Sequence, residues 1–144
     1  MKKLSLYVFL ALMFCNVVSA KIIKLQKCYN TRQTMGVFEH WRFEKYEFVI
    51  DTNKEILTEL YVYTDEQVKF LEERRKTLKG PPTEKIHIIN YKITYMDDNY
   101  VKALEESKSK TSWSAYTVDL KKLEVHFTNS VLEALNSVYK CEIL

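Results

Sequence analysis

The sequence predicts a mainly β protein, with α+β as the alternative. We expect one antiparallel sheet of about seven strands, strongly curved or closed into a small barrel. Apolar residues recur with period two along most of the chain, which is typical of strands. The links between these segments are too short for the crossovers of a parallel sheet. One longer segment, residues 64–79, has helical spacing, and we expect it to cover one face or end of the sheet.

The first two strands are expected at residues 21–30 and 37–51. Within 37–51 the apolar residues change parity, from Val37, Trp41 and Phe43 to Tyr46, Phe48 and Ile50. A slip of one residue moves every following side chain to the other face of a sheet. We therefore expect either a bulge near Glu44 and Lys45 or two strands in series.

The stretch VIDTNKEI follows, and its Asp51, Asn53 and Glu55 alternate like the first ligands of a calcium loop. An EF-hand loop that starts at Asp51 would need glycine at its sixth position and glutamate at its twelfth. The chain has Ile56 and Val62 there. We interpret the stretch as a turn that connects two strands, the second at residues 55–64.

Residues 64–79 are predicted to form the covering helix. Thr64 and Gln67 make a capping box at its start, and Gly80 with the two prolines after it ends it. The apolar stripe consists of Val68, Leu71 and Leu78. We interpret the basic residues 74–76 as a solvated surface near the helix C-terminus rather than a phosphate site.

The second half of the chain is expected to continue as strands at residues 85–96, 100–106, 113–120, 123–128 and 137–144. The composition of residues 100–106 also permits a helix. Ser130 and Glu133 form a second capping box, which predicts a short C-terminal helix at residues 130–136.

The N-terminus has the pattern of a secretory signal peptide. Lys2 and Lys3 precede an apolar run at residues 4–15, and cleavage is expected after Ala20. The apolar run is shorter than the ~20 residues of a membrane-spanning helix, so we expect no stable membrane span after cleavage. The sequence thus predicts a cleaved segment, residues 1–20, and one exported domain, residues 21–144, in the periplasm or outside the cell.

The charges and cysteines of the exported domain limit its partners and its compartment. Removal of Lys2 and Lys3 leaves 20 basic residues beside 19 acidic ones, and this near-neutral balance gives no reason to expect nucleic-acid binding. Cys28 and Cys141 remain, and in an oxidising compartment we expect them to form a disulfide; the alternative is two separate buried thiols.

We expect neither an enzyme nor a metal or cofactor site. His40, His87 and His126 lack the spacing of metal ligands, and carboxylates adjacent in sequence point to different sides of a strand or helix. The chain contains neither a Gly-x-Ser-x-Gly motif nor a glycine-rich phosphate loop.

Aromatic residues on strands are the best candidates for a binding site. His87, Tyr91 and Tyr95 share one face of the strand at 85–96 with Ile89 and Ile93, and we expect this face to turn inward. Other candidate ligand-binding residues are Tyr61, Tyr63 and Trp113. Tyrosine and tryptophan combine an apolar body with a polar tip, which suits an amphipathic ligand, although they are also ordinary strand formers.

The sequence therefore predicts a non-catalytic exported protein that binds an apolar or amphipathic small molecule or a lipid. The alternative is a cell-envelope module that recognises another protein through an open sheet edge or an aromatic patch. Closure of the sheet around an aromatic cavity would favour the first hypothesis, and an open sheet over a solid core would favour the second.

Overall fold

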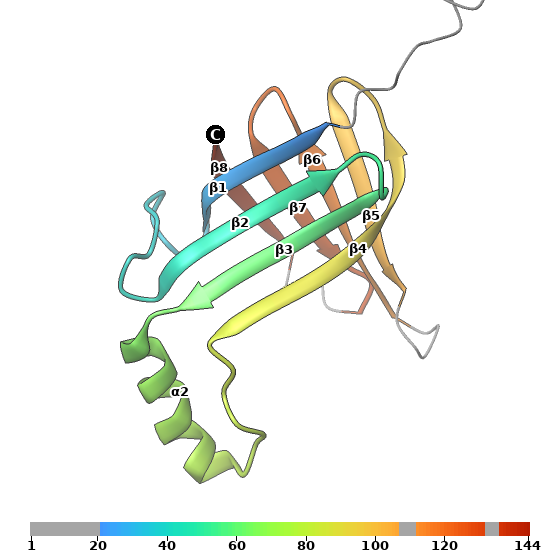
Figure 1. Cartoon of the computed structure of the whole chain (residues 1–144). Helices are drawn as coiled ribbons and strands as arrows, with labels where there is room; N and C mark the ends of the chain where they lie inside the picture. Colours follow the sequence, from blue (N-terminus) through green and yellow to red (C-terminus); the bar gives the residue numbers. More distant parts are fainter. Residues whose placement is uncertain (1–20, 107–111, 132–135) are drawn as a thin grey trace, which may run out of the picture.

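The computed structural model describes residues 21–106, 112–131 and 136–144 as an antiparallel barrel of eight strands (Figure 1). The predicted signal peptide, residues 1–20, lies outside the described residues. So do residues 132–135, which make up most of the predicted helix at 130–136. No helix in the described ranges is long and apolar enough to cross a membrane.

Each strand pairs with its neighbours in sequence, and the last pairs with the first, so the sheet closes. The strands are β1 (Ile22–Asn30), β2 (Phe43–Asp51), β3 (Ile56–Tyr63), β4 (Ile86–Met96), β5 (Tyr100–Glu106), β6 (Trp113–Asp119), β7 (Glu124–Asn129) and β8 (Ser137–Ile143). The mainly β prediction is confirmed. The strand beyond the expected number is β5, whose sequence also permitted a helix.

The irregularity expected in the second strand is a bulge, because the β2–β3 register shifts between Phe43 and Lys45. A second register shift lies in the β1–β8 pair, between Gln26 and Tyr29, where Lys27 has a φ of 50°. Bulges bend a strand and increase its twist, which helps a small sheet close.

The predicted disulfide is present: Cys28 of β1 is bonded to Cys141 of β8, 113 residues later in the sequence. The bond therefore joins the first and last strands at the seam where the barrel closes.

The side chains inside the barrel change from aliphatic to aromatic along its length. The β2–β3 register pairs Ile50 with Leu57 at one level and Tyr46 with Tyr61 at another. The fully buried aliphatic residues include Leu25, Ile50, Leu57, Val101, Val118 and Val125. This aliphatic part supplies the hydrophobic core, whereas the aromatic part lies toward the loop that joins β1 to β2.

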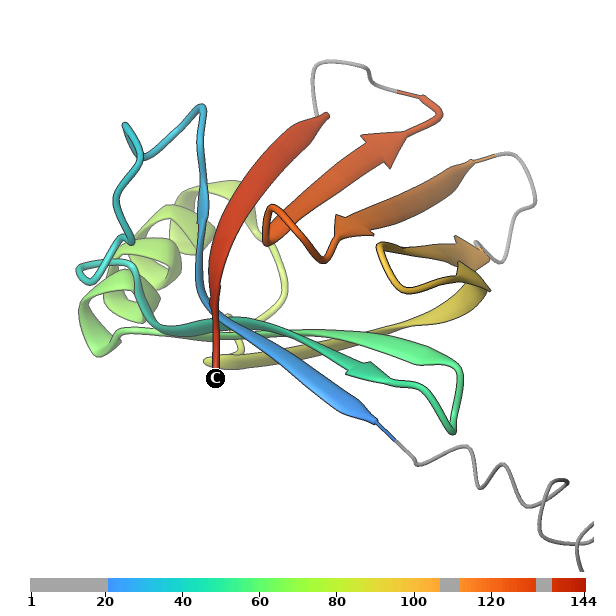
Figure 2. The same ribbon diagram turned by 90° about the horizontal axis from the view of Figure 1, so that it is seen from above.

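The helix α2 (Asp65–Leu78) follows β3 and stands at one end of the barrel. Figures 1 and 2 show it at the same end as the loop of residues 31–42. The Thr64 side chain accepts a hydrogen bond from the Gln67 backbone at 3.1 Å, as the capping box predicts. The left-handed C-cap residue is Lys79, not Gly80. Of the expected apolar stripe, Val68 and Leu71 are half-buried and Leu78 is exposed, and Phe70 beside the stripe is exposed as well.

Candidate ligand-binding pocket

A pocket of about 200 Å³ lies where β1 leads into the loop of residues 31–42. Residues from β1, this loop, β2, β3 and β8 line it, and six of them are aromatic. The lining consists of Cys28, Tyr29, Asn30, Gln33, Thr34, Glu39, Arg42, Phe43, Tyr46, Glu59, Tyr61, Tyr63 and Tyr139.

The bulge in β2 explains how so many rings face this pocket. Phe43 and Tyr46 have opposite parity and would point to opposite faces of a regular strand. The register shift between Phe43 and Lys45 places both against the core. The ring of Tyr46 then stacks on Tyr61, with centroids 5.5 Å apart, and on Tyr139, at 5.4 Å. Phe43 stacks on Tyr63 at 5.5 Å.

A buried carboxylate, that of Glu59, lies among these tyrosines. Glu59 has the same parity in β3 as Leu57 and Tyr61, so its side chain points into the barrel, where it is only 5% exposed. Its Oε1 accepts a hydrogen bond from the Tyr46 hydroxyl at 2.6 Å. Its Oε2 accepts from the Tyr91 and Tyr116 hydroxyls, at 3.1 Å and 3.0 Å. Three strands besides β3 thus converge on one carboxyl group.

The three donors keep their protons because their surroundings disfavour the phenolate. Burial, and next the negative charge of Glu59, raise the pKa of Tyr46, Tyr91 and Tyr116 above the usual value for tyrosine. The hydroxyl groups are therefore neutral donors at any physiological pH, and they compensate in part for the desolvation of the carboxylate.

Arg42 and Glu39 add a second pair of charges to the pocket wall. The Arg42 Nη1 lies 3.5 Å from Glu39 Oε2, and the guanidinium group lies over the ring of Phe43 at 5.1 Å. The side chain of Arg42 is 34% exposed, and that of Glu39 is 13% exposed. Arg42 Nε is buried and has no hydrogen-bond partner among the described residues, which is unfavourable for a buried donor.

Four of the six predicted ligand-binding residues lie in or beside this site. Tyr61 and Tyr63 line the pocket. Tyr91 does not line the pocket, but its hydroxyl donates to Glu59, which does. The His87 ring stacks on Tyr61, with the two centroids 4.5 Å apart, and its Nε2 lies 2.8 Å from the Glu84 carbonyl oxygen.

The expectation that Tyr95 faces inward is wrong. The β4–β5 register shifts between Ile93 and Tyr95, so the alternation that buries Tyr91 and Ile93 ends there. Tyr95 is 50% exposed, and its hydroxyl donates to Asp97 Oδ2 at 2.6 Å. Trp113, at the start of β6, is also exposed and does not line the pocket.

Sequence reasoning missed the carboxylate at the centre of the site. A signal was present, because Glu59 alternates with Leu57, Tyr61 and Tyr63 and is the charged member of an otherwise apolar or aromatic face. Tyr139 and the Arg42–Glu39 pair had no comparable signal, because their positions depend on the closure of the barrel and on an irregular loop.

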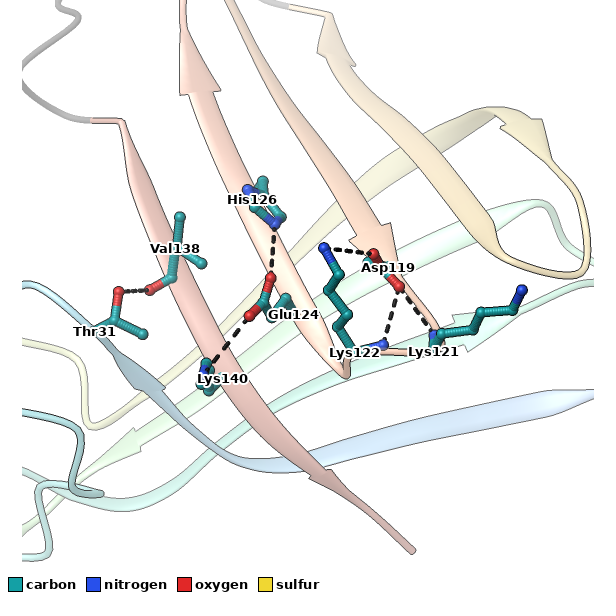
Figure 3. A network of polar contacts seen from close by, with 8 residues as sticks. All are labelled: Thr31, Asp119, Lys121, Lys122, Glu124, His126, Val138 and Lys140. Carbon is teal, nitrogen blue, oxygen red and sulfur yellow. Dashed lines mark hydrogen bonds and ion pairs between the residues drawn. The ribbon is translucent and has the colours of Figure 1, made fainter.

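Polar side chains away from the pocket have local partners. His126 lies 3.4 Å from Glu124, which also lies 3.8 Å from Lys140. Asp119 accepts hydrogen bonds from the backbone of the β6–β7 turn (Figure 3).

Asp51 Oδ1 accepts hydrogen bonds from the backbone nitrogens of Asn53 and Lys54, both at 3.1 Å, which confirms the predicted turn. Within the described ranges, no group of three His, Cys, Asp or Glu residues could hold a metal ion.

Comparisons of the chain with protein-family models, with curated proteins and with solved structures find no match.

Proposed function

We propose that this protein is an exported, non-catalytic binding protein whose ligand is a small amphipathic molecule held in the pocket beside the loop of residues 31–42. The observation that carries the proposal is the lining of this pocket, in which six aromatic side chains surround a few polar groups. Small-molecule sites typically combine apolar and aromatic walls with a small number of placed polar groups.

The size of the pocket limits the ligand. Its volume of about 200 Å³ is below the ~300–1,000 Å³ of sites for drug-sized molecules. The ligand is therefore either a compact molecule or the end group of a longer one, such as a lipid, whose remainder stays outside the pocket.

We infer binding rather than catalysis from the state of the groups in the pocket. The Glu59 carboxylate already accepts hydrogen bonds from three tyrosine hydroxyls, so the protein itself occupies most of the acceptor positions that a general base would need. Cys28 also lines the pocket, but its sulfur is in a disulfide and cannot act as a thiolate nucleophile.

The disulfide also supports the exported location, because such bonds persist in oxidising compartments. The signal-peptide pattern of residues 1–20 points to the same compartment.

The alternative hypothesis, a protein-interaction module, has less support. Each described strand has two neighbours, so none of them offers an open edge to a partner strand. Such a module would have to use an exposed apolar patch, for example around Phe70 and Leu78 of α2.

Native mass spectrometry of the protein purified from its own host tests the proposal. We expect a bound small molecule that is lost, or reduced at least about tenfold, in Tyr63→Ala, which removes one wall of the pocket. Tyr100→Ala is the matched control, because Tyr100 is also a partly exposed strand tyrosine but lies outside the lining. A chain that carries no small molecule, or equal loss in both variants, would refute the proposal.

A further inference from the structure

The charge of Glu59 is not balanced by a cation within the described structure. Glu47, another buried carboxylate, lies 3.3 Å from Lys24 and 3.8 Å from Lys45. Buried Asp119 has Lys122 at 3.9 Å. Glu59 makes no ion pair in the described ranges and is held by neutral tyrosine hydroxyls alone. Since buried charges in proteins are normally paired, this carboxylate lacks the partner that the other two have.

The pocket as a whole also has an excess of negative charge. Its charged lining residues are Glu39, Glu59 and Arg42, two acidic side chains and one basic one. The Arg42 side chain is 34% exposed although its Nε is buried, so water screens part of its charge, and Glu39 already lies beside it. Glu59 is almost fully buried, where charges interact more strongly than at the surface. The less screened charge in the pocket is therefore negative.

We propose that the ligand is a small organic cation, an amine with an aromatic or apolar body, whose ammonium group is balanced by Glu59 and Glu39. This inference rests on the proposed binding function and gives its ligand a chemical class. An ionised carboxylate offers about four acceptor positions, and Glu59 uses three of them, so one remains for an N–H donor. The surrounding tyrosine and phenylalanine rings favour a cation as well, through the negative potential of their faces.

A set of near-isosteric probes separates charge from shape. Phenethylamine, phenylacetamide and phenylacetate share an aromatic body and differ in their cationic, neutral and anionic end groups. Isothermal titration calorimetry of the disulfide-bonded protein at pH 7 is expected to show the tightest binding for phenethylamine and the weakest for phenylacetate, with at least about a tenfold difference between them.

Two variants at the pocket wall give opposite expectations. Glu39→Gln removes one negative charge and should weaken phenethylamine binding about tenfold or more. Arg42→Gln removes the cation that lies beside Glu39 and should strengthen phenethylamine binding. Glu44→Gln is the control, because Glu44 pairs with Lys85 at 2.8 Å and does not line the pocket. Glu59→Gln should abolish the preference for the amine, and circular dichroism would show whether that variant remains folded.

Each result has a defined meaning. If phenylacetate or phenylacetamide binds best, or if the Glu39 and Arg42 variants shift affinity in the opposite directions, the cation inference is overturned while the binding function stands. If none of the three probes binds and the purified protein carries no small molecule, both proposals fail.

Discussion

Removal of the Tyr116 hydroxyl tests the importance of the tyrosine cluster around Glu59. Tyr116 is 3% exposed, its hydroxyl lies 3.0 Å from Glu59 Oε2, and it does not line the pocket. Tyr116→Phe keeps the ring and deletes one of three donors to a buried carboxylate. A hydrogen bond to a charged group contributes about 1.5–3 kcal/mol, so we expect the free energy of unfolding to fall by that amount.

For a domain of this size, 1 kcal/mol corresponds to about 4 °C in melting temperature, which gives a decrease of about 6–12 °C. Urea unfolding of the disulfide-bonded protein at pH 7, followed by far-UV circular dichroism, would measure the free energy directly. Tyr95→Phe is the matched control, since its hydroxyl bonds to Asp97 in solvent and should contribute no more than about 0.5 kcal/mol. Equal stability of the two variants would show that the hydroxyls do not support Glu59 as we describe.

Three further predictions concern pH, the disulfide and the N-terminus. The three tyrosines that donate to Glu59 have a pKa raised above 10.0 in the folded state, so their contribution to stability is complete below about pH 10 and is lost as the pH rises. Above pH 10, each further pH unit is expected to lower the free energy of unfolding by about 1.4 kcal/mol for each of these tyrosines. For the three together, the decrease is about 4 kcal/mol per pH unit. Urea unfolding at several pH values, with tyrosinate absorbance as a second signal, would measure this, and constant stability up to pH 11.5 would contradict it. Reduction of the Cys28–Cys141 bond should destabilise the protein by up to about 4–5 kcal/mol, since it releases a loop of more than a hundred residues in the unfolded chain; unchanged urea midpoints with and without reductant would count against this. The exported protein should begin at Lys21, and intact-mass measurement that finds Met1 retained would refute cleavage.

The sequence predicted most of the fold because strand alternation and turn residues act locally. The β2 bulge, the turn at Asp51 and the first turn of α2 all follow from neighbouring residues. The disulfide was predictable for a different reason, because residues 21–144 contain two cysteines and therefore allow one pairing.

The site was harder to predict because it depends on contacts between distant strands. Tyr91 was correctly placed inside by alternation, but the register shift after Ile93 turned Tyr95 outward, and nothing in the local pattern marks that shift. Glu59 has the sequence context of an ordinary strand residue, and its role depends on Tyr46 and Tyr116, which donate to it from β2 and β6. A period-two pattern identifies the residues that share one face of a strand, but not the residues of other strands that lie opposite that face.

The position of the disulfide links the covalent state of the chain to the wall of the proposed ligand-binding pocket. Cys28 is part of the pocket wall as well as of the seam between β1 and β8. If the seam loosens on reduction, a ligand that requires the closed wall binds the oxidised protein more tightly than the reduced one. Thermodynamic linkage then requires the converse, that the bound ligand makes the disulfide harder to reduce. A chain whose two cysteines are still reduced would have an incomplete pocket wall, and it would bind the ligand tightly only after the disulfide has formed.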